Sequence, residues 1–301
     1  MSPKIYVIFN PAAGQTDPAR VKPSLDETLS RSGWPYELYE TTGDEDLKKI
    51  VGTAVDRGFE LVIACGGDGT VSGVADGLAG SDIPLAILPT GTTNAFATAL
   101  GIPPVLQDAL ELLSEGHQKK PVDAIKYHDR YFLLEASLGA FSASFEEVGR
   151  EKKDRLGWLA YVDTAVRKWI GLDRLRMKIE VDGVRYAFHA AEVALFNTSQ
   201  VGLIDEDLDA DIRLDDGALD LYAVRSKNLW DLIRMLVYRM RGKPKHAPHM
   251  QYWRVKRSLR IDSLPKVSFQ ADGEVRGKTP AVFSVAPGVL RVIVPATGEG
   301  Q

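Results

Sequence analysis

Apolar runs of strand length alternate with segments of helical period through the first third of the chain. The strand-like runs are Ile5–Asn10, Tyr36–Glu40, Leu61–Cys65 and Leu85–Leu88. Between them, segments such as Asp44–Arg57 and Val71–Leu78 repeat apolar residues at the spacing of a helix. Because alternating strands and helices form parallel sheets with helical covers, we predict an α/β domain whose parallel sheet is flanked by helices.

The pattern changes after about Asp123, where strand signals dominate. The runs of strand type are Ala124–Tyr127, Arg130–Ala136, Arg176–Val181, Tyr186–Phe196, Ala218–Val224, Val267–Gln270 and Val289–Val294. Turn-forming pairs such as Asp182-Gly183 and Asp272-Gly273 separate many of them, which predicts a mainly antiparallel β-sandwich. Helical insertions are expected at Trp158–Ile170 and Leu229–Met240.

These two patterns divide the chain into residues 1–124 and 125–301, with the final strand expected to pack back on the first domain. A length of 301 residues suits two domains, and 45% hydrophobic residues suffice for ordinary cores. The net charge of -4 argues against a nucleic-acid partner. Since Cys65 is the single cysteine, no intrachain disulfide can form, and we expect a reducing, cytoplasmic location.

The longest uncharged stretch, residues 83–107, is not expected to span a membrane. Pro84, Pro89, Pro103 and Pro104 interrupt it, and its backbone would lack hydrogen-bond partners in lipid. The apolar run Ile5–Phe9 is shorter than the core of a signal peptide and is interpreted as a strand. We therefore predict no transmembrane segment.

A glycine-rich loop, Gly66-Gly67-Asp68-Gly69-Thr70, follows a predicted strand and precedes a predicted helix. Glycines there let backbone N–H groups approach an anion, and the helix adds its N-terminal dipole. Because Asp68 would repel a bare phosphate, it implies a bridging cation such as Mg²⁺. The loop lacks the lysine of a P-loop, and Ser72 replaces the third glycine of a dinucleotide motif. The alternative is a tight strand-to-helix turn.

Two further loops follow predicted strands of the same sheet. Asn10-Pro11-Ala12-Ala13-Gly14 follows the first strand, and Pro89-Thr90-Gly91-Thr92-Thr93-Asn94 follows another. Ligands of parallel sheets bind at the carboxyl ends of the strands, where these loops emerge. Three such loops at one edge favour a nucleotide pocket over three ordinary turns.

Acidic residues in the second half suggest a base and a metal site. Glu274 follows a turn, so it is a candidate general base or simply part of a solvated hairpin. The segment 205–211 fails as an EF-hand because Ile212 stands at the glycine position, and a solvated loop is the better interpretation. Asp215 and Asp216, followed by Gly217, are better candidates for metal ligands.

Between residues 225 and 260 the chain carries many lysines and arginines and a single acid, Asp231. Apolar residues are interleaved with them. A basic amphipathic helix of this kind can lie on an anionic membrane surface, or it can pack on the sandwich with a solvated basic edge. Both interpretations stay open.

Together, these motifs resemble the diacylglycerol kinase catalytic family, in particular its soluble bacterial lipid kinase branch, with sphingosine and ceramide kinases as relatives. In the first domain the resemblance rests on Asn10–Gly14, Gly66–Thr70 and the Gly91-Thr92-x-Asn94 run. In the second domain it rests on residues 214–220, from Leu214 to Asp220, and on Asp272-Gly273-Glu274 followed by Thr279-Pro280.

The resemblance implies an NAD kinase- or phosphofructokinase-like first domain, a β-sandwich lipid-substrate domain and an active site in the cleft. Asp68 and Glu274 would be catalytic, Glu274 as the general base. ATP would be the co-substrate, and a structural Mg²⁺ would bind the Asp216 carboxylate and the carbonyls of Arg213 and Ala218. The implied ATP contacts are Asn10, Pro11, Ala12, Ala13, Gly14, Thr41, Gly66, Gly67, Asp68, Gly69, Thr70, Val71, Ser72 and Thr92.

Several residues depart from the family pattern. Ser72 replaces a common asparagine, Ala95 an aspartate and Gln15 a lysine of some members. The hypothesis is an ATP-dependent kinase of a lipid hydroxyl, peripheral on the inner membrane surface and compatible with a homodimer. The alternatives are an NAD kinase-like small-molecule kinase and a non-catalytic nucleotide- or lipid-binding protein. The sequence does not name the lipid.

Overall fold

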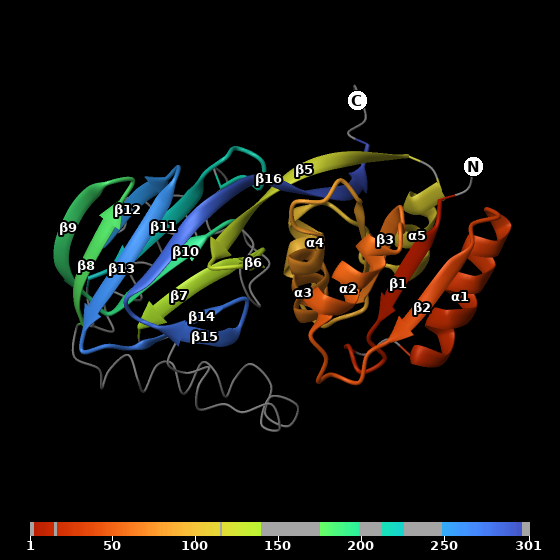
Figure 1. Cartoon of the computed structure of the whole chain (residues 1–301), viewed down its shortest axis with the longest axis horizontal. Coiled ribbons are helices and arrows are strands. Elements are labelled where there is room, and N and C mark those ends of the chain that lie inside the picture. The colour runs from red at the N-terminus through yellow and green to blue at the C-terminus, as the bar shows by residue number, and fades with distance from the viewer. Residues whose placement is uncertain are drawn as a thin grey trace. The chain divides into compact units, whose positions relative to one another are not determined.

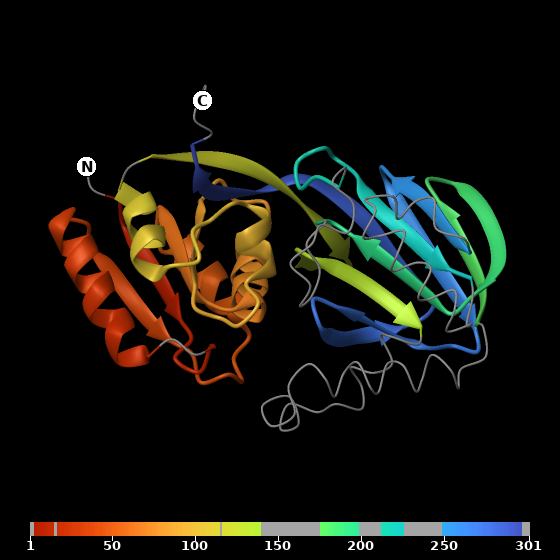
Figure 2. The ribbon, with the colours of Figure 1, turned by 180° about the vertical axis from the view of Figure 1, so that it is seen from behind.

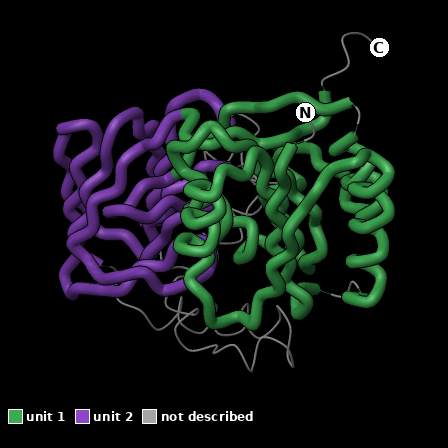
Figure 3. Tube along the Cα trace, turned by 45° about the vertical axis from the view of Figure 1, so that its right-hand side comes forward, with its two compact units in different colours: residues 1–124, 288–301 green, residues 125–287 purple. Residues whose placement is uncertain are grey.

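The computed structural model describes residues 3–14, 17–114, 116–139, 175–198, 212–225 and 249–296. The chain divides into two compact units (Figure 3). Unit 1 contains residues 1–124 and 288–301, and unit 2 contains residues 125–287. Both helical insertions expected from the sequence, and the acidic segment 205–211, lie outside the described residues.

Unit 1 contains a parallel sheet with the strand order β2-β1-β3-β4. The strands β2, β1 and β3 are labelled side by side in Figure 1, and Figure 2 shows the same ribbon from behind. Its strands are β1 (Ile5–Phe9), β2 (Tyr36–Glu40), β3 (Leu61–Gly66) and β4 (Leu85–Pro89). Every residue of β1, β3 and β4 is buried, as expected for strands covered on both faces. The predicted α/β fold of the first domain is therefore confirmed.

Helices cover both faces of this sheet. They are α1 (Pro18–Arg31), α2 (Leu47–Asp56), α3 (Asp68–Leu78), α4 (Ala95–Ala99) and α5 (Leu106–Ser114). The connection from β1 to β2 runs in one direction across the sheet, and the connections from β2 to β3 and from β3 to β4 run in the other direction. Because such connections are right-handed, α1 lies on one face of the sheet, and α2 and α3 lie on the other face. The helices α2 and α3 pack against each other, and α1 packs against α5.

The sequence pattern did not single out α1, which carries Pro23 inside the helix. A proline there removes one backbone hydrogen bond, which normally weakens a helix. The N-terminus of α1 offsets this loss, because the Asp17 side chain accepts a hydrogen bond from the Ala19 N–H at 3.0 Å and Pro18 occupies the first turn. The buried side chains of Val21, Leu25 and Leu29 hold it on unit 1.

The long strand β16 (Ala281–Pro295) takes part in both units. Near its start it pairs with β13 (Ser258–Leu264) in unit 2. Near its end, Val292 pairs with Leu85 of β4 in parallel orientation. The N–H of Gly80 donates to the carbonyl oxygen of Val289 at 2.9 Å. The last described residues of the chain thereby complete unit 1.

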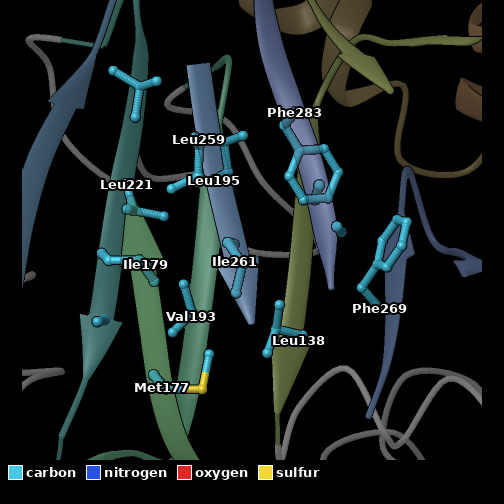
Figure 4. Packing of buried hydrophobic residues seen from close by; sticks show 14 of the residues in the cluster. Leu138, Met177, Ile179, Val193, Leu195, Leu221, Leu259, Ile261, Phe269 and Phe283 are labelled. Atoms are coloured by element: carbon cyan, nitrogen blue, oxygen red, sulfur yellow. The ribbon is translucent and has the colours of Figure 1, made fainter. Parts of the chain in front are cut away.

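Unit 2 is built from two antiparallel sheets, which confirms the predicted sandwich. One has the order β12-β11-β10-β7-β14-β15, formed by Met250–Val255, Leu219–Val224, Glu192–Phe196, Glu135–Gly139, Ser268–Ala271 and Glu274–Lys278. The other contains β13 and β16 with β8 (Leu175–Val181) and β9 (Val184–Ala190), and β5 (His117–Tyr127) pairs with β6 (Arg130–Phe132). Leu138, Val193, Ile261 and Phe283 point toward one another in the core between the strands (Figure 4).

Two runs that were each expected as one strand prove to be two. The run Arg130–Ala136 contains β6 and the start of β7, and the run Tyr186–Phe196 contains β9 and β10. In both cases the chain crosses from one sheet of the sandwich to the other. Since Leu133 and Ala191 at the crossings are buried, no polar residue marks the break. No helix in the described ranges is long and apolar enough to cross a membrane.

The packing of α2 against α3 generates a prediction at Gly77. A Cβ atom added there would lie 2.6 Å from the Cβ atom of buried Val51, so Gly77→Ala should destabilise the protein by about 1–3 kcal/mol. Gly52 on α2 has no heavy atom within 4 Å of its added Cβ, so Gly52→Ala should be neutral or stabilise by up to about 1 kcal/mol. Urea unfolding of both variants measures the difference. Equal stabilities would contradict this packing.

Candidate functional site

The glycine-rich loop forms the turn between β3 and α3. Gly66 ends β3, Gly67 is the N-cap of α3, and Asp68 begins the helix. A Cβ atom on Gly66 would lie 2.5 Å from the Oγ1 atom of Thr70, so the Thr70 side chain occupies the space that glycine leaves. The loop is thus a closely packed strand-to-helix turn.

The loop after β4 touches this turn through its backbone. A Cβ atom on Gly91 would lie 2.4 Å from the Cα atom of Gly67, so there is no room for a side chain at Gly91. The N–H of Thr90 donates to the carbonyl oxygen of Gly66 at 3.1 Å. Asn94, in a left-handed conformation, closes the loop by accepting the Gly91 N–H at 3.0 Å and donating to the Gly91 carbonyl at 2.9 Å.

The third loop, after β1, joins the other two. Asn10 donates from Nδ2 to the Thr70 hydroxyl at 3.0 Å, and its Oδ1 accepts the Ala12 N–H at 3.0 Å. Gly14 has φ +65°, and a Cβ atom there would lie 2.0 Å from the carbonyl oxygen of Thr90. The structure therefore brings the three predicted loops together at the carboxyl ends of β1, β3 and β4.

These loops surround the N-terminus of α3, whose first N–H groups have no partner inside the helix. Gly69 is exposed, with no heavy atom within 4 Å of an added Cβ. A helix start of this kind suits an anion such as a phosphate group. Thr92 is also exposed, whereas Val71 and Ser72 are buried.

Thr41 follows β2, and its N–H donates to the carbonyl oxygen of Phe9 at 2.9 Å. The residue is buried, and its hydroxyl makes no hydrogen bond within the described part of the chain. A buried hydroxyl without a partner is unfavourable unless a ligand or water supplies one. Thr41 is therefore consistent with the predicted contact to ATP, which stays a prediction.

Asp68 has a structural role that its sequence neighbours did not reveal. Its Oδ1 accepts the N–H of Phe96 at 3.1 Å and so caps α4, since Asn94 makes no side-chain cap. Burial raises the pKa of Asp68, and backbone N–H groups including that of Phe96 partly oppose this effect. A divalent cation beside the carboxylate would favour its charged form. The contact of Asp68 with Mg²⁺ stays a prediction.

Glu274 lies in unit 2, immediately after the two-residue turn between β14 and β15. Asp272 and Gly273 both have positive φ, of 47° and 80°, as the favoured hairpin turn requires. Glu274 is exposed, and its Oε2 atom forms an ion pair with the Nη2 atom of Arg276 at 2.9 Å. The guanidinium of Arg276 also lies 5.4 Å from the ring centroid of Phe132.

Sequence reasoning missed Arg276. The signal was present, because residues two apart on a strand share a face, and Glu274-Val275-Arg276 therefore places a cation beside the carboxylate. The ion pair holds the Glu274 carboxylate near one position. An exposed carboxylate held in this way is able to accept a proton from a neighbouring hydroxyl.

Of the predicted metal ligands, the Asp216 carboxylate is engaged with protein groups. Asp216 Oδ1 accepts the Ala218 N–H at 3.1 Å, and Oδ2 pairs with the guanidinium of Arg254. The Arg213 side chain pairs with Asp215 at 3.2 Å, and the role of the Arg213 and Ala218 carbonyls as ligands stays a prediction. A cation at Asp216 would have to share or replace Arg254, so we derive no chemical step from it. Among the described residues, no group of three acidic, histidine or cysteine side chains is placed to hold a metal.

Two family models match the chain. The diacylglycerol kinase catalytic domain matches residues 4–127, and the YegS C-terminal NAD kinase beta sandwich-like domain matches residues 138–294. Diacylglycerol kinases of Staphylococcus aureus strains bovine RF122 / ET3-1 and MRSA252 are each 30% identical over 285 residues, 94% of this chain and 90% of the relative.

The fold is similar to that of a solved structure described as a diacylglycerol kinase from Bacillus anthracis strain Sterne. The two chains are 26% identical, with a TM-score of 0.80 and 97% of each chain covered. Sequence and fold agree over both units. The chain therefore belongs to the diacylglycerol kinase family.

Proposed function

We propose that this chain transfers the γ-phosphoryl group of ATP to a hydroxyl group of a lipid with a diacylglycerol-like structure. The observation that carries the proposal is the convergence of three loops around the N-terminus of α3, with the Gly67 and Gly91 backbones in contact. Relatives over nearly the whole chain are diacylglycerol kinases, which supports a lipid acceptor.

Phosphoryl transfer depends mainly on positioning and on stabilising charge. In this proposal the N–H groups of Gly69 and its neighbours bind the phosphates, and the hydrogen bond from Asn10 to Thr70 fixes two of the loops relative to each other. Asp68 would hold Mg²⁺, which, when bound, neutralises charge on the phosphoryl oxygens. Asp68 also keeps α4 capped through Phe96.

Glu274 accepts the proton of the lipid hydroxyl in this mechanism. The hydroxyl oxygen forms a bond to the γ-phosphorus, the bond from that phosphorus to the bridging oxygen breaks, and ADP leaves. The proton stays on the Glu274 carboxylate until solvent removes it. Arg276 keeps that carboxylate oriented before the reaction.

A small-molecule kinase is the second candidate. It is favoured by one observation, that the model matching the second unit is described as NAD kinase beta sandwich-like. NAD therefore belongs in the panel of acceptors beside lipids. The named relatives favour the lipid acceptor over NAD.

A lipid acceptor lies in a bilayer, so we propose that the protein works in peripheral contact with a membrane. The basic segment expected to mediate this contact lies mostly outside the described residues, which resume at His249. Within the described part, Arg254 pairs with Asp216 and Arg257 donates to the Asp182 carbonyl at 3.0 Å. Some of the basic charge thus stabilises unit 2 itself. Cytoplasmic location and homodimer formation stay predictions.

Glu274→Gln tests the base directly. Because the amide keeps the shape of the side chain but cannot accept the proton, lipid phosphorylation should fall by about 10²–10⁴-fold. The assay follows labelled ATP with micelles of dioleoylglycerol, phosphatidylglycerol or ceramide, and with NAD. The matched control is Glu180→Gln, which removes another glutamate–arginine pair of unit 2, with Arg185 at 2.8 Å. Full activity of a folded Glu274→Gln protein would place the base elsewhere.

Asp68 calls for two substitutions, because it both caps α4 and would hold Mg²⁺. Asp68→Asn retains an oxygen for the Phe96 N–H, so its melting temperature should match that of the wild type. Asp68→Ala loses that bond and should be less stable. Both should lose about 10²-fold or more of the phosphorylation rate, since both lack the charge. Activity retained in Asp68→Asn but lost in Asp68→Ala would reduce Asp68 to a structural residue.

Substitutions of Gly69 and Gly91 distinguish an effect on nucleotide binding from an effect on packing. Gly91→Ala should lower stability by at least about 1–3 kcal/mol, because its Cβ would lie 2.4 Å from Gly67 Cα. Gly69→Ala meets no atom within 4 Å and should fold normally, yet its methyl group should hinder phosphate and weaken ATP binding. Calorimetry of ATP binding and thermal unfolding measure both. Unchanged ATP affinity in Gly69→Ala would argue against phosphate at this helix start.

A further inference from the structure

The turn that carries Glu274 is attached to a buried polar network. Gln270, on β14, has no exposed surface. Its Nε2 donates to Glu135 Oε1 at 2.7 Å and to the Ser137 hydroxyl at 2.6 Å, and its Oε1 accepts the Gly273 N–H at 2.8 Å. One amide therefore connects the turn to two residues of β7.

The orientation of this amide follows from its partners. The Gly273 N–H can only donate, so the oxygen of Gln270 must face it. The nitrogen then faces β7, where the carboxylate of Glu135 is an acceptor. The contact with Glu135 and the contact with Gly273 consequently depend on each other.

Asp272 adds a second attachment. Its carboxylate accepts the N–H groups of Leu133, Leu134 and Glu135 at 2.9, 2.9 and 3.2 Å, and its own N–H donates to the Glu135 carbonyl at 3.0 Å. A two-residue Asp-Gly hairpin needs none of these bonds to form. The turn is thus held in place relative to β7 far more firmly than the hairpin geometry requires.

The network carries a cost in stability at neutral pH. Glu135 is 9% exposed, and burial raises its pKa to about 7; the hydrogen bond from Gln270 opposes this shift, and the Glu192 and Asp272 charges add to it. Since the folded-state pKa exceeds the unfolded value of 4.5, the protonated form stabilises the fold at low pH. That contribution is lost as the pH rises from 4.5 toward 7. A buried carboxylate that costs stability near neutral pH is better explained by the geometry it enforces.

We infer that Glu135 and Gln270 are positioning residues, which hold the Asp272-Gly273 turn so that Glu274 presents its carboxylate to the acceptor hydroxyl. The inference rests on the proposed role of Glu274 as the general base. It assigns a catalytic purpose to a network that lies on the buried side of the turn, whereas Glu274 itself is exposed.

The first test measures the turn itself, without any substrate. Gln270→Ala removes the acceptor for the Gly273 N–H, so hydrogen exchange in a peptide covering residues 271–276 should become at least about tenfold faster. Ser137→Ala is the matched control, because it removes a hydrogen bond from the same amide but leaves the link to Gly273 in place. Equal exchange in both variants would overturn the inference.

The second test is a double-mutant cycle with dioleoylglycerol micelles and ATP. Gln270→Ala should lower kcat by about 10- to 100-fold with the apparent KM for ATP unchanged, since small misplacements of a catalytic group cost that much. In the Glu274→Gln background the same change should lower kcat by less than about twofold, because it acts through Glu274. A similar fall in both backgrounds would show that Gln270 acts independently of Glu274 and would overturn the inference.

A charge swap covers the case in which Gln270→Ala fails to fold. Gln270→Glu alone should lower kcat, because it sets two buried carboxylates against each other. The double change Glu135→Gln with Gln270→Glu reverses the donor and acceptor and should restore at least about half of the lost activity. No restoration in a folded double variant would overturn the inference. A fully active Glu274→Gln variant would show that Glu274 is not the base. If Glu274→Gln is impaired but the variants of Glu135 and Gln270 are not, the proposed function stands and only the positioning role is wrong.

Discussion

The candidate site in unit 1 depends on one steric constraint, the contact between the backbones of two loops. Gly67 and Gly91 approach so closely that a Cβ atom on Gly91 would lie 2.4 Å from the Cα atom of Gly67. The neighbouring strands β3 and β4 bring the loops side by side, and the absence of side chains lets them meet. Without this contact the N-terminus of α3 would not be framed by loops from three strands.

Much of unit 1 could be predicted because β1, β3 and β4 are buried on both faces and therefore form continuous apolar runs in the sequence. The glycine-rich loops were recognisable because several glycines between a strand and a helix are typical of loops that bind phosphate. The cap from Asp68 to Phe96 could not be predicted. It joins residues 28 positions apart, and only the paths of two loops decide whether they meet.

In unit 2 the sequence indicated a sandwich but left the pairings open. The strand β12 was not expected, since it is only partly buried and its residues give no clear apolar alternation. The strand β13 was also not expected, although its buried residues alternate as a strand requires. Two side-chain partners, Arg254 for Asp216 and Gln270 for Glu135, come from strands far along the chain. Such pairs depend on strand register, which spacing along a single sequence does not specify. Arg276 was the exception, because its relation to Glu274 is local.

The strand β16 also has a consequence for synthesis of the protein on the ribosome. Domains usually fold in the order in which they are made. Here Val292 pairs with Leu85 of β4, and the Ala296 N–H donates to the Gly116 carbonyl at 2.7 Å, so the sheet of unit 1 waits for residues made after all of unit 2. Until then the edge of β4 stays open to other chains. Unit 1, although most of it is translated first, is thus the last part of the described chain to be completed.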